Sequence, residues 1–514
     1  MMSSSSCSSV TSSTAATASS HTRLIQVVDA LVRRSGAEPW GVRELAAELD
    51  ESRSTVNRIL ASLVEVGLAT EAGTGKYAVG PRVDVLARTL SDASTLLGRG
   101  SRSLGDLAAA SRCTALVSVC CQREGGYFIA ACSEAKAALI FKPALGALYP
   151  LAFGDIGRAF QRFLADDLSS QDRESDVAAY ALSQHEQLGL LSESEFPRAS
   201  SISVRRMANG LVVAVSVHCA SSTETAQPRA WEADAQHVIA RIQADMESGS
   251  VERIQRLPDV IEPDSKSTVG RLERLLLLAC AFPQGVKNSV DLHDQLLCNA
   301  ATAKRLIESG SQAGVVRWVA GTLYPGPKLY QWAARITAAD RDLADMTHRI
   351  VSSLVQETGE TIALLSYDEA TGTAEFLDVI QGWRPIQYKL QVNVEVPLYA
   401  GAAGKAVLAN CDSQVAESLD LVRITDATIT SRELLRADLE AIRARGWATG
   451  EGERVLGAFG LAVPFFVDGR IRGSISATIP QYRKSELDLP LLLTRMREAT
   501  TRIERLLSLG VKAA

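Results

Sequence analysis

Residues 52–63 combine a hydrophobic stripe with a polar face, and this pattern predicts a short amphipathic helix. Val56, Ile59, Leu60 and Leu63 follow one another at spacings of three, one and three residues, so they lie on one side of a helix. Most other residues of the segment are polar or small and lie away from this stripe. We therefore expect a helix that buries one face and presents polar side chains on the other.

A second hydrophobic stripe precedes the first by only a few residues. Val42, Leu45, Ala46 and Leu49 repeat the helical spacing. Ser52, between the two stripes, is a favourable N-cap because its hydroxyl can accept a hydrogen bond from a free backbone N–H. Two short amphipathic helices joined by a tight turn, the second with Arg and Asn on its outer face, predict a helix-turn-helix.

The flanking segments complete a small domain. An apolar helix is expected at residues 23–32, and strands are expected at 68–72 and 76–79. The intervening Gly73-Thr74-Gly75 supplies the turn of a β-hairpin. Three helices followed by a hairpin predict a winged helix-turn-helix domain.

Several runs in this domain resemble the DNA-binding domain of IclR-type transcriptional regulators. They are Arg43-Glu44-Leu45-Ala46, Ser54-Thr55-Val56-Asn57-Arg58-Ile59-Leu60, Gly67-Leu68 and Lys76-Tyr77-Ala78-Val79-Gly80. The resemblance implies that the second helix of the pair enters the major groove of DNA.

The polar face of that helix supplies the expected DNA contacts. Arg58 suits guanine and Asn57 suits adenine, whereas Arg53 and Lys76 are placed for phosphates. The expected DNA-binding residues of this domain are Arg53, Ser54, Thr55, Asn57, Arg58 and Lys76. An ordinary solvated surface helix is the alternative.

The chain repeats itself at a constant offset. In the DNA-binding region the pairs Thr55 and Thr302, Arg58 and Arg305, and Gly67 and Gly314 are each 247 residues apart. The same offset joins Pro150 and Pro397, Leu151 and Leu398, Gly154 and Gly401, Gly157 and Gly404, and Ala159 and Ala406. One offset shared by two separate regions indicates a tandem duplication.

The second DNA-binding region diverges from the first. Asn299 is its expected N-cap, and Ala303, Leu306 and Ile307 keep the hydrophobic stripe. Gly310 replaces the last leucine of the stripe, which predicts a weaker helix end. The segment that follows is not expected to form a clean hairpin.

Charge favours DNA binding by this second region. Residues 22–82 hold eight Lys/Arg and eight Asp/Glu, whereas residues 266–335 hold nine and four, a net charge of +5. Lys304 and Arg305 are the expected contacts, and cationic side chains strengthen binding to phosphates. The alternative is that this region is a degenerate copy with only a structural role.

Mixed strands and helices between residues 83 and 247 predict an α+β domain that suits a sensor. We expect a helical connector at 83–112, strands at 115–121, 127–132, 138–141 and 210–219, a loop entering a helix at 150–160, and a helix at 231–247. Asp155 at the start of the middle helix would oppose an anionic ligand, so this domain is structural, binds a different ligand or binds none. Ser216 and His218 lie on the last strand, where His218 is expected in the core, with ligand contact as the alternative.

The corresponding region of the second half carries a clearer signature. Residues 397–409, Pro-Leu-Tyr-Ala-Gly-Ala-Ala-Gly-Lys-Ala-Val-Leu-Ala, resemble the effector-binding domain of IclR-type regulators, which has a GAF-like fold. Runs at 438–446, 461–464 and 473–476 support the resemblance. It implies that an effector binds between this helix start and the following strands, with contacts at Ala402, Ala403, Gly404, Gly460, Ser476 and Thr478. Ser476 and Thr478 alternate along one face of a strand, as a pocket wall requires.

Two departures from the family pattern bear on the ligand. Gly450 stands where many members place an acid and Gly460 where a larger residue is common, so we expect an effector larger and more apolar than a simple keto acid. Residues 401–405 resemble a phosphate-binding loop, but Tyr399 and Ala406 break that motif. The free N–H groups of a helix N-terminus can instead receive an acidic or carbonyl-bearing ligand.

Composition narrows the function classes. The 514 residues are 46% hydrophobic with a net charge of −5, so folded cores are expected and any DNA contact must come from a local patch. No hydrophobic run has transmembrane length, and the first twenty residues predict a disordered tail and no signal peptide. No catalytic serine motif, metal-ligand cluster or complete phosphate loop is found, so neither an enzyme, a metal nor a cofactor is expected.

The cysteines favour a reducing compartment. Nine cysteines include no C-x-x-C pair, and six histidines are scattered, which argues against a structural zinc site. Cys120 and Cys121 are expected as buried strand residues because their neighbours are apolar; a redox-sensing pair is the alternative.

These inferences predict an α+β multidomain protein with two winged helix-turn-helix domains and two GAF-like sensor domains. The expected boundaries are a tail at 1–20, a DNA-binding domain at 21–82, a connector and degenerate sensor at 83–247, a linker at 248–267, a divergent DNA-binding domain at 268–336, and a connector and effector-binding domain at 337–514.

The resemblance implies a bacterial, cytoplasmic transcriptional regulator. Its expected partners are double-stranded operator DNA and a small organic effector, a carboxylic acid or an aromatic metabolite, with control of catabolic genes as the outcome. The two units would act as a built-in pseudo-dimer, with a homodimer of the chain as a further option. A ligand-sensing or scaffold protein that has lost DNA binding is the alternative.

Overall fold

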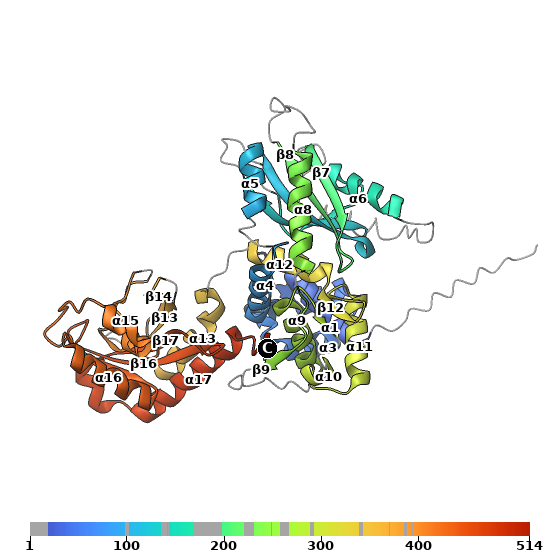
Figure 1. Cartoon of the computed structure of the whole chain (residues 1–514). Coiled ribbons are helices and arrows are strands. Elements are labelled where there is room, and N and C mark those ends of the chain that lie inside the picture. The colour runs from blue at the N-terminus through green and yellow to red at the C-terminus, as the bar shows by residue number, and fades with distance from the viewer. Residues whose placement is uncertain are drawn as a thin grey trace, which may run out of the picture.

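The computed structural model describes residues 19–97, 102–134, 141, 143–167, 198–219, 231–247, 249–256, 267–287, 292–338, 343–369, 371–384, 388–392 and 394–513. Figure 1 shows a helix-rich centre that joins two domains, each containing a β-sheet. The first α+β domain (described residues between 102 and 247) lies above the centre, and the second α+β domain (between 343 and 507) lies to its left. None of the helices formed by these residues is long and apolar enough to cross a membrane. The tail expected at 1–20 falls almost wholly outside the described residues.

The centre contains two winged-helix units with the same order of elements. The first unit comprises α1 (Ser20–Arg33), β1 (Trp40–Gly41), α2 (Val42–Glu48), α3 (Arg53–Glu65), β2 (Ala69–Glu71) and β3 (Lys76–Val79). The second comprises α9 (Thr268–Ala281), β10 (Val286–Lys287), α10 (Leu292–Gln295), α11 (Ala300–Gln312), β11 (Val316–Val319) and β12 (Thr322–Pro325). Their small sheets have the matching orders β1-β3-β2 and β10-β12-β11.

The predicted helix starts are confirmed in both units. The Ser52 hydroxyl accepts a hydrogen bond from the Thr55 N–H at 3.2 Å, and the Asn299 side chain accepts one from the Thr302 N–H at 2.8 Å. Each side chain thereby satisfies a backbone donor that the first turn leaves free. The hydrophobic stripe of α3 lies in the core, with Val56, Leu60 and Leu63 fully buried and Ile59 partly buried.

One prediction for the second unit, that its wing is not a clean hairpin, is wrong. β11 and β12 form a regular antiparallel hairpin in which Val319 pairs with Thr322. The two turn residues, Ala320 and Gly321, both have positive φ values (48° and 78°), as a tight hairpin turn requires. Gly310 does not end α11, which continues to Gln312; a Cβ at Gly310 would lie 2.9 Å from the Val316 side chain, so glycine permits close packing of the wing.

A long helix follows each wing, and these two helices pack against each other at the centre (Figure 1). They are α4 (Pro81–Ala93) and α12 (Pro327–Ala338). Each begins after a glycine at which a Cβ would lie about 2 Å from a backbone oxygen: 2.2 Å from Gly67 O for Gly80, and 2.1 Å from Gly314 O for Gly326. The two units therefore hold their wings against their helices by the same close backbone contact.

The second residue of each long helix carries a buried cation that crosses to the other unit. Arg82 of α4 pairs with Glu273 of α9 at 2.7 Å and donates to the carbonyls of Leu506 and Ser508 at the end of α17 (Leu489–Leu507). Lys328 of α12 pairs with Asp29 of α1 at 3.3 Å and with Glu124 of the first α+β domain at 2.5 Å. Each long helix thus contacts the α+β domain of the other half of the chain.

Replacing Arg82 by lysine should loosen the second α+β domain from the centre. Lysine keeps the charge opposite Glu273 but lacks the planar fork that also reaches two carbonyls. We expect a cost of about 1–2 kcal/mol, which is the net worth of the lost hydrogen bonds. Amide hydrogen exchange should accelerate about tenfold in residues 506–513, whereas Arg88→Lys, on the same helix, should leave it unchanged. Unchanged exchange in Arg82→Lys would show that this contact does not hold the domain.

Both α+β domains contain a five-stranded antiparallel sheet among the described residues. The first comprises α5 (Arg102–Ser111), β4 (Thr114–Cys121), η1 (Gln122–Glu124), β5 (Gly126–Ser133), β6 (Leu148–Pro150), α6 (Gly154–Asp167), β7 (Ala199–Arg206), β8 (Val212–His218) and α8 (Glu232–Glu247), with sheet order β6-β5-β4-β8-β7. The second comprises α13 (Leu343–Thr358), β13 (Thr361–Asp368), β14 (Thr373–Ile380), α14 (Ala402–Leu408), α15 (Ser413–Ser418), α16 (Arg432–Arg445), β15 (Ala448–Glu451), β16 (Ala458–Val467), β17 (Arg470–Pro480), η4 (Gln481–Glu486) and α17, with order β14-β13-β17-β16-β15.

The prediction for the first α+β domain is largely confirmed. The strands expected at 115–121, 127–132 and 210–219 and the helices expected at 150–160 and 231–247 are present with small shifts at their ends. β6 and β7 were not predicted, and the strand expected at 138–141 falls almost wholly outside the described residues.

The two sheets share details of register at the offset found in the sequence. The β4–β5 pairing shifts between Val117 and Ser118, and the β13–β14 pairing shifts between Leu364 and Leu365, 247 residues later. Phe128 pairs with Leu148 at one edge of the first sheet, and an isolated bridge joins Glu375 and Glu395 at the same offset. Such irregularities are structural features that persist within families.

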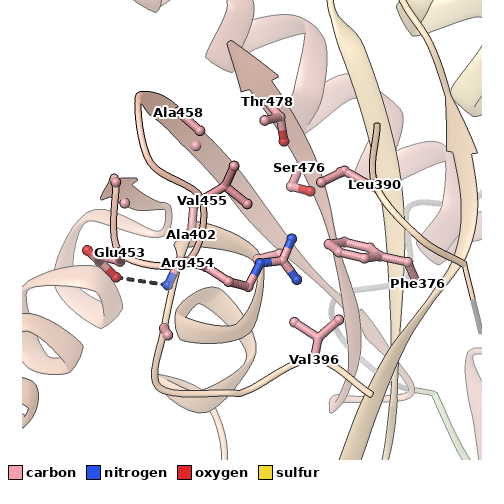
Figure 2. A pocket seen from close by; sticks show the side chains of 16 residues that line it. Phe376, Leu390, Val396, Ala402, Glu453, Arg454, Val455, Ala458, Ser476 and Thr478 are labelled. Atoms are coloured by element: carbon pink, nitrogen blue, oxygen red, sulfur yellow. Dashed lines mark hydrogen bonds between the residues drawn. The ribbon is translucent and has the colours of Figure 1, made fainter. Parts of the chain in front are cut away.

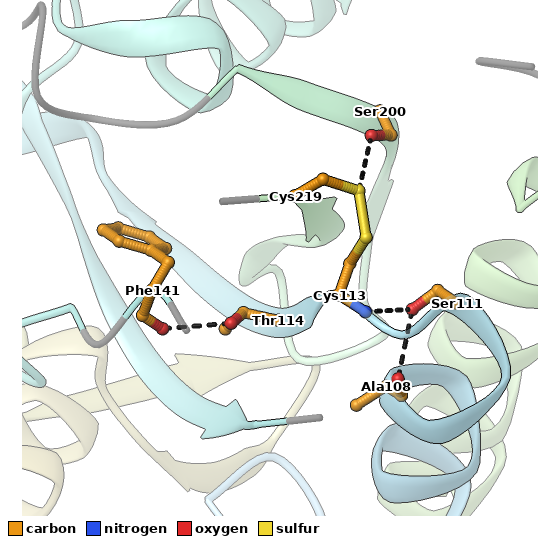
Figure 3. The surroundings of a disulfide bond; sticks show 7 residues. All are labelled: Ala108, Ser111, Cys113, Thr114, Phe141, Ser200 and Cys219. Carbon is orange, nitrogen blue, oxygen red and sulfur yellow. Dashed lines mark hydrogen bonds between the residues drawn. A yellow bond between two sulfur atoms is a disulfide. The ribbon is translucent and has the colours of Figure 1, made fainter. Parts of the chain in front are cut away.

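The expectation that the cysteines are reduced is wrong for one pair. Cys113 and Cys219 form a disulfide, although 106 residues separate them (Figure 3). The sheet explains the pairing, because the neighbouring residues Thr114 and His218 are partners in the β4–β8 register. By contrast, Cys120 and Cys121 are buried as expected, and burial raises the pKa of Cys120 to about 12, which disfavours the reactive thiolate.

The segment expected to be a linker, 248–267, contains a short strand. β9 (Ile254–Arg256) pairs antiparallel with β18 (Val511–Ala513) at the end of the chain. Figure 1 shows the C-terminus beside β9 at the centre of the molecule. The connection between the two halves is therefore tied to the last residues of the second half.

Candidate functional site: an effector pocket and a DNA-binding face

A pocket opens in the second α+β domain between the start of α14 and the strands β16 and β17. It encloses about 470 Å³ of space including its mouth. Its wall contains five of the six predicted effector residues, namely Ala402, Ala403, Gly460, Ser476 and Thr478. The other lining residues are Phe376, Leu390, Val396, Ala400, Gly401, Gly450, Gly452, Glu453, Arg454, Val455 and Ala458.

Gly404, the sixth predicted residue, does not line this pocket. A Cβ at Gly404 would lie 2.5 Å from Pro397 O and 2.8 Å from Leu398 Cα. The glycine therefore allows the helix to pack against the preceding loop. Gly404 thus serves close backbone packing, while Ala402 and Ala403 form the side of the helix that lines the pocket.

A buried ion network fixes the start of α14. Lys405 is 2% exposed, and its Nζ lies 2.6 Å from Glu453 Oε1 and 2.7 Å from Asp438 Oδ2. The other oxygen of Glu453 accepts a hydrogen bond from the Gly401 N–H at 2.8 Å. Lys405 thus lies in the protein interior with two acids, which agrees with the argument against a phosphate-binding loop.

Arg454 is the charged residue that the sequence did not reveal. Figure 2 shows its guanidinium projecting into the pocket, and it lies 5.0 Å from the centre of the Phe376 ring. No carboxylate or other hydrogen-bond partner of Arg454 is found among the described residues, and burial lowers the pKa of its guanidinium. One arginine in a loop carries no spacing signal, so only the fold could identify it.

The opposite wall carries hydroxyl groups. Ser476 is 3% exposed, and its Oγ has no hydrogen-bond partner within the described part of the chain. Thr478 follows it on the same face of β17, as predicted (Figure 2). Gly450 lets β15 approach the helix start, because a Cβ there would lie 2.8 Å from the Ala402 N atom. An arginine, a helix N-terminus and a buried hydroxyl therefore surround one apolar space.

Aromatic side chains of the first α+β domain stand at positions that correspond to the pocket wall, because Tyr149 and Phe153 lie 247 residues before Val396 and Ala400. Tyr127 and Tyr149 stack with ring centres 5.5 Å apart, and Tyr149 stacks with Phe153 at 5.6 Å. Asp155 is turned toward β7, where it accepts a hydrogen bond from the Ala199 N–H at 3.0 Å.

His218 lies in the core of the first α+β domain, as predicted. His218 is fully buried, with its Nε2 3.0 Å from Ser216 Oγ. The register pairs Thr114 with His218 and Thr361 with Thr478, so the histidine occupies the position of a pocket residue. The prediction of a packed core histidine is confirmed.

The polar face of α3 is exposed. Arg53, Ser54, Asn57 and Arg58 are solvent-exposed, whereas Thr55 is half-buried and hydrogen-bonds to Ser52. Neither arginine has an ion-pair partner among the described residues. On the wing, Lys76 pairs with Glu38 at 2.5 Å, and a phosphate would have to compete with that carboxylate.

The corresponding face of α11 is also exposed. Lys304 and Arg305 project to solvent, and Lys304 lies 3.9 Å from Glu308 on the same helix. Part of the positive charge of this unit is used elsewhere, because Lys328 is buried between two acids and Lys287 pairs with Glu252. The net charge of +5 in the sequence therefore overstates what this unit offers to DNA.

In the first unit, helix α3 carries exposed arginines that have no ion-pair partner among the described residues. A winged helix of this kind, joined to an α+β domain with a pocket, defines the class of ligand-responsive DNA-binding regulators. Comparisons with known proteins give the family. The description "IclR helix-turn-helix domain" matches residues 20–73, and "Bacterial transcriptional regulator IclR C-terminal" matches residues 336–505. The chain belongs to the IclR family of bacterial transcriptional regulators, and it is a DNA-binding regulator that senses a small molecule.

Two curated regulators agree with this assignment. The chain is similar to the transcriptional repressor IclR of Escherichia coli, at 30% identity over 229 residues, which are 42% of this chain and 81% of the repressor. It is 28% identical to the acetate operon repressor of Salmonella typhimurium over 30% of this chain and 59% of that protein. A solved IclR-type regulator from Silicibacter aligns with a TM-score of 0.38 at 23% identity, covering 46% of this chain and 96% of that one. These relatives are regulators, not enzymes.

Proposed function

We propose that the chain is a tandem duplication in which two complete units form a pseudo-dimer. The repeated register shift of the large sheets, the matching order of the winged-helix elements and the paired helices α4 and α12 support this proposal. The crossed contacts of Arg82 and Lys328 support it further, because each joins the two halves in an equivalent way. The domain boundaries follow the sequence prediction, with 21–82 and 268–336 as DNA-binding domains.

The two units would present two recognition helices to one operator. The contacts would come from Arg53, Ser54, Thr55, Asn57, Arg58 and Lys76 in the first unit and from Lys304 and Arg305 in the second. Because the two helices carry different side chains, the two halves of the operator would differ in sequence. The exposed, unpaired Arg58 on α3 is the observation that carries the DNA-binding proposal.

The effector of the second α+β domain would be an organic carboxylate with an apolar body. Arg454 and the free N–H groups of α14 suit a carboxylate, and Phe376, Leu390 and Val396 suit a hydrophobic or aromatic group. Effector binding would be transmitted through α17, whose end contacts Arg82 of α4. A ligand can shift the spacing of the two recognition helices only if it binds the two arrangements with different affinity.

Alanine variants of the two recognition helices test whether both bind DNA. Arg58→Ala should weaken binding to the upstream intergenic DNA about 5- to 100-fold, since a bidentate base contact is worth about 1–3 kcal/mol. The double variant Lys304→Ala/Arg305→Ala should weaken it about tenfold and reduce the salt dependence by about two released ions. Quantitative gel shifts at several salt concentrations measure both effects.

Arg162→Ala, an exposed arginine of α6, is the matched control and should bind DNA as the wild type does. Wild-type affinity in the double variant would reject the pseudo-dimer while leaving DNA binding by the first unit intact. Wild-type affinity in all variants would reject DNA recognition by either helix.

A further inference from the structure

A large cavity lies at the junction of the first α+β domain with the second winged-helix unit. It encloses about 1610 Å³ of space including its mouth. Its walls come from α1, from the end of β4 and η1, from the start of β8, and from the end of α11 with β11 and the start of α12. We propose that this junction cavity is a second ligand site, separate from the effector pocket, and that it binds a small polar anion with two or more negative charges.

Arg317 of β11 is the central residue of the junction cavity. Its guanidinium lies against the backbone of Gly210, where a Cβ would be 2.4 Å from the Arg317 Nη2 atom. The Nε atom is buried and has no hydrogen-bond partner in the described part of the chain. A buried guanidinium N–H without a partner costs free energy, and an anion placed beside it would supply the missing acceptor.

Two further arginines surround this position. Burial, followed by repulsion from Arg206 and Arg123, lowers the pKa of Arg317, so the three cations lie close together. Arg123 donates to the carbonyls of Ser311 and Gln312 at 2.9 and 2.8 Å. No carboxylate of the described residues lies within ion-pair distance of Arg123 or Arg317. Arg123 and Arg317 therefore gather positive charge that no carboxylate of the described residues pairs with.

The two acidic residues that line the junction cavity form ion pairs with a lysine. Asp29 and Glu124 both pair with Lys328, at 3.3 and 2.5 Å. Burial acts to lower the pKa of Lys328, but these two carboxylates outweigh it and hold that pKa above its ordinary value. Both carboxylates that line the cavity therefore have a cation of their own.

The walls indicate the chemistry of the ligand. Beside the arginines the cavity is lined by the hydrogen-bonding side chains of Thr22, Gln26, Gln122, Ser311 and Gln312. The rest of the lining includes the apolar residues Ile25, Val212, Val316, Trp318 and Val319, so the cavity offers both polar and apolar surface. A phosphate ester or a compound with several carboxylates would satisfy both the charges and the polar walls.

A ligand at this location could influence DNA binding by the second recognition helix. Arg123 belongs to the first α+β domain, and the carbonyls that it contacts end α11, the second recognition helix. An anion that draws Arg123 toward Arg317 would compete with this contact. The first α+β domain would then act through its junction with the second winged-helix unit.

Titration calorimetry of the full chain with pyrophosphate and with citrate, at low ionic strength, tests the proposal. We expect at least one of the two to bind, and binding to weaken tenfold or more in Arg317→Gln. The two probes separate a phosphate site from a polycarboxylate site. Arg162→Gln on the surface of α6 should bind the probe as the wild type does. No binding of either probe, or equal binding by the wild type and Arg317→Gln, overturns the proposal.

Hydrogen exchange on the wild-type protein provides a test that needs no variant. The bound probe should slow exchange in residues 122–124 and 311–318, and protection only near the effector pocket overturns the proposal. Duplex DNA is the competing occupant of these arginines. If Arg317→Gln weakens DNA binding but leaves probe binding unchanged, the arginine contacts DNA phosphates and the ligand site is rejected.

Discussion

Lys405→Met is expected to destabilise the second α+β domain by about 3–5 kcal/mol, the range found when one partner of a buried ion pair is removed. Lys405 is 2% exposed, so methionine would fill its volume but leave Glu453 and Asp438 without their cation. The two carboxylates would then repel each other in a site that excludes water. Differential scanning calorimetry of the full chain should show a lower melting temperature for the transition of this domain.

Lys484→Met is the matched control for this experiment. Lys484 also pairs with an acid, Glu451, but both side chains are more than two-fifths exposed. Exposed ion pairs contribute about 0–1 kcal/mol, so the control should melt close to the wild type. Equal melting of the two variants would mean that the Lys405 network does not hold the start of α14.

Arg454→Gln should weaken the binding of organic carboxylates to the full chain about 10- to 100-fold. A charge-assisted hydrogen bond contributes about 1.5–3 kcal/mol, and glutamine keeps polarity while removing the charge. The ligand for this test is chosen by thermal-shift screening of aliphatic and aromatic carboxylates against the wild type. Its affinity for both proteins is then measured by titration calorimetry.

Two controls make the Arg454 result specific. The primary amide of the same ligand should bind the wild type weakly, because it has no charge to pair with Arg454. Its affinity should equal that of the acid for Arg454→Gln, where the protein lacks the charge. Arg472→Gln, an exposed position on β17, should leave affinity unchanged. If the acid binds Arg454→Gln as tightly as the wild type, its carboxylate does not contact Arg454. The proposed class of effector would then lose its basis.

The elements that could be predicted from the sequence depend on local patterns. The stripe from Val56 to Leu63 defines α3, and Ser52 and Asn299 cap their helices as their chemistry requires. The second wing was missed because its turn depends on Ala320 adopting a positive φ, which a non-glycine residue seldom does. Ser476 and Thr478 were predicted from the resemblance to the family, and their alternation along one strand is a local pattern that agrees with a pocket wall.

The residues that the sequence did not reveal act through contacts between distant segments. Arg454 faces Phe376 only because a loop of the second half folds over its sheet. Cys113 and Cys219 meet because β4 and β8 are neighbours, although the two cysteines are 106 positions apart in the sequence. Sequence offsets indicated a repeat, but they gave no sign that Arg82 and Lys328 cross between the halves.

Hydroxyl-radical footprinting of the chain on its bound DNA tests the central claim, that one chain carries two DNA-binding units, most directly. The wild type should protect two groups of backbone positions, separated by about one turn of the duplex or a multiple of it. The variant Lys304→Ala/Arg305→Ala should lose one group of protected positions and keep the other. The variant Arg58→Ala should weaken protection in the group that the double variant keeps. A footprint that is identical in the wild type and the double variant would contradict the account.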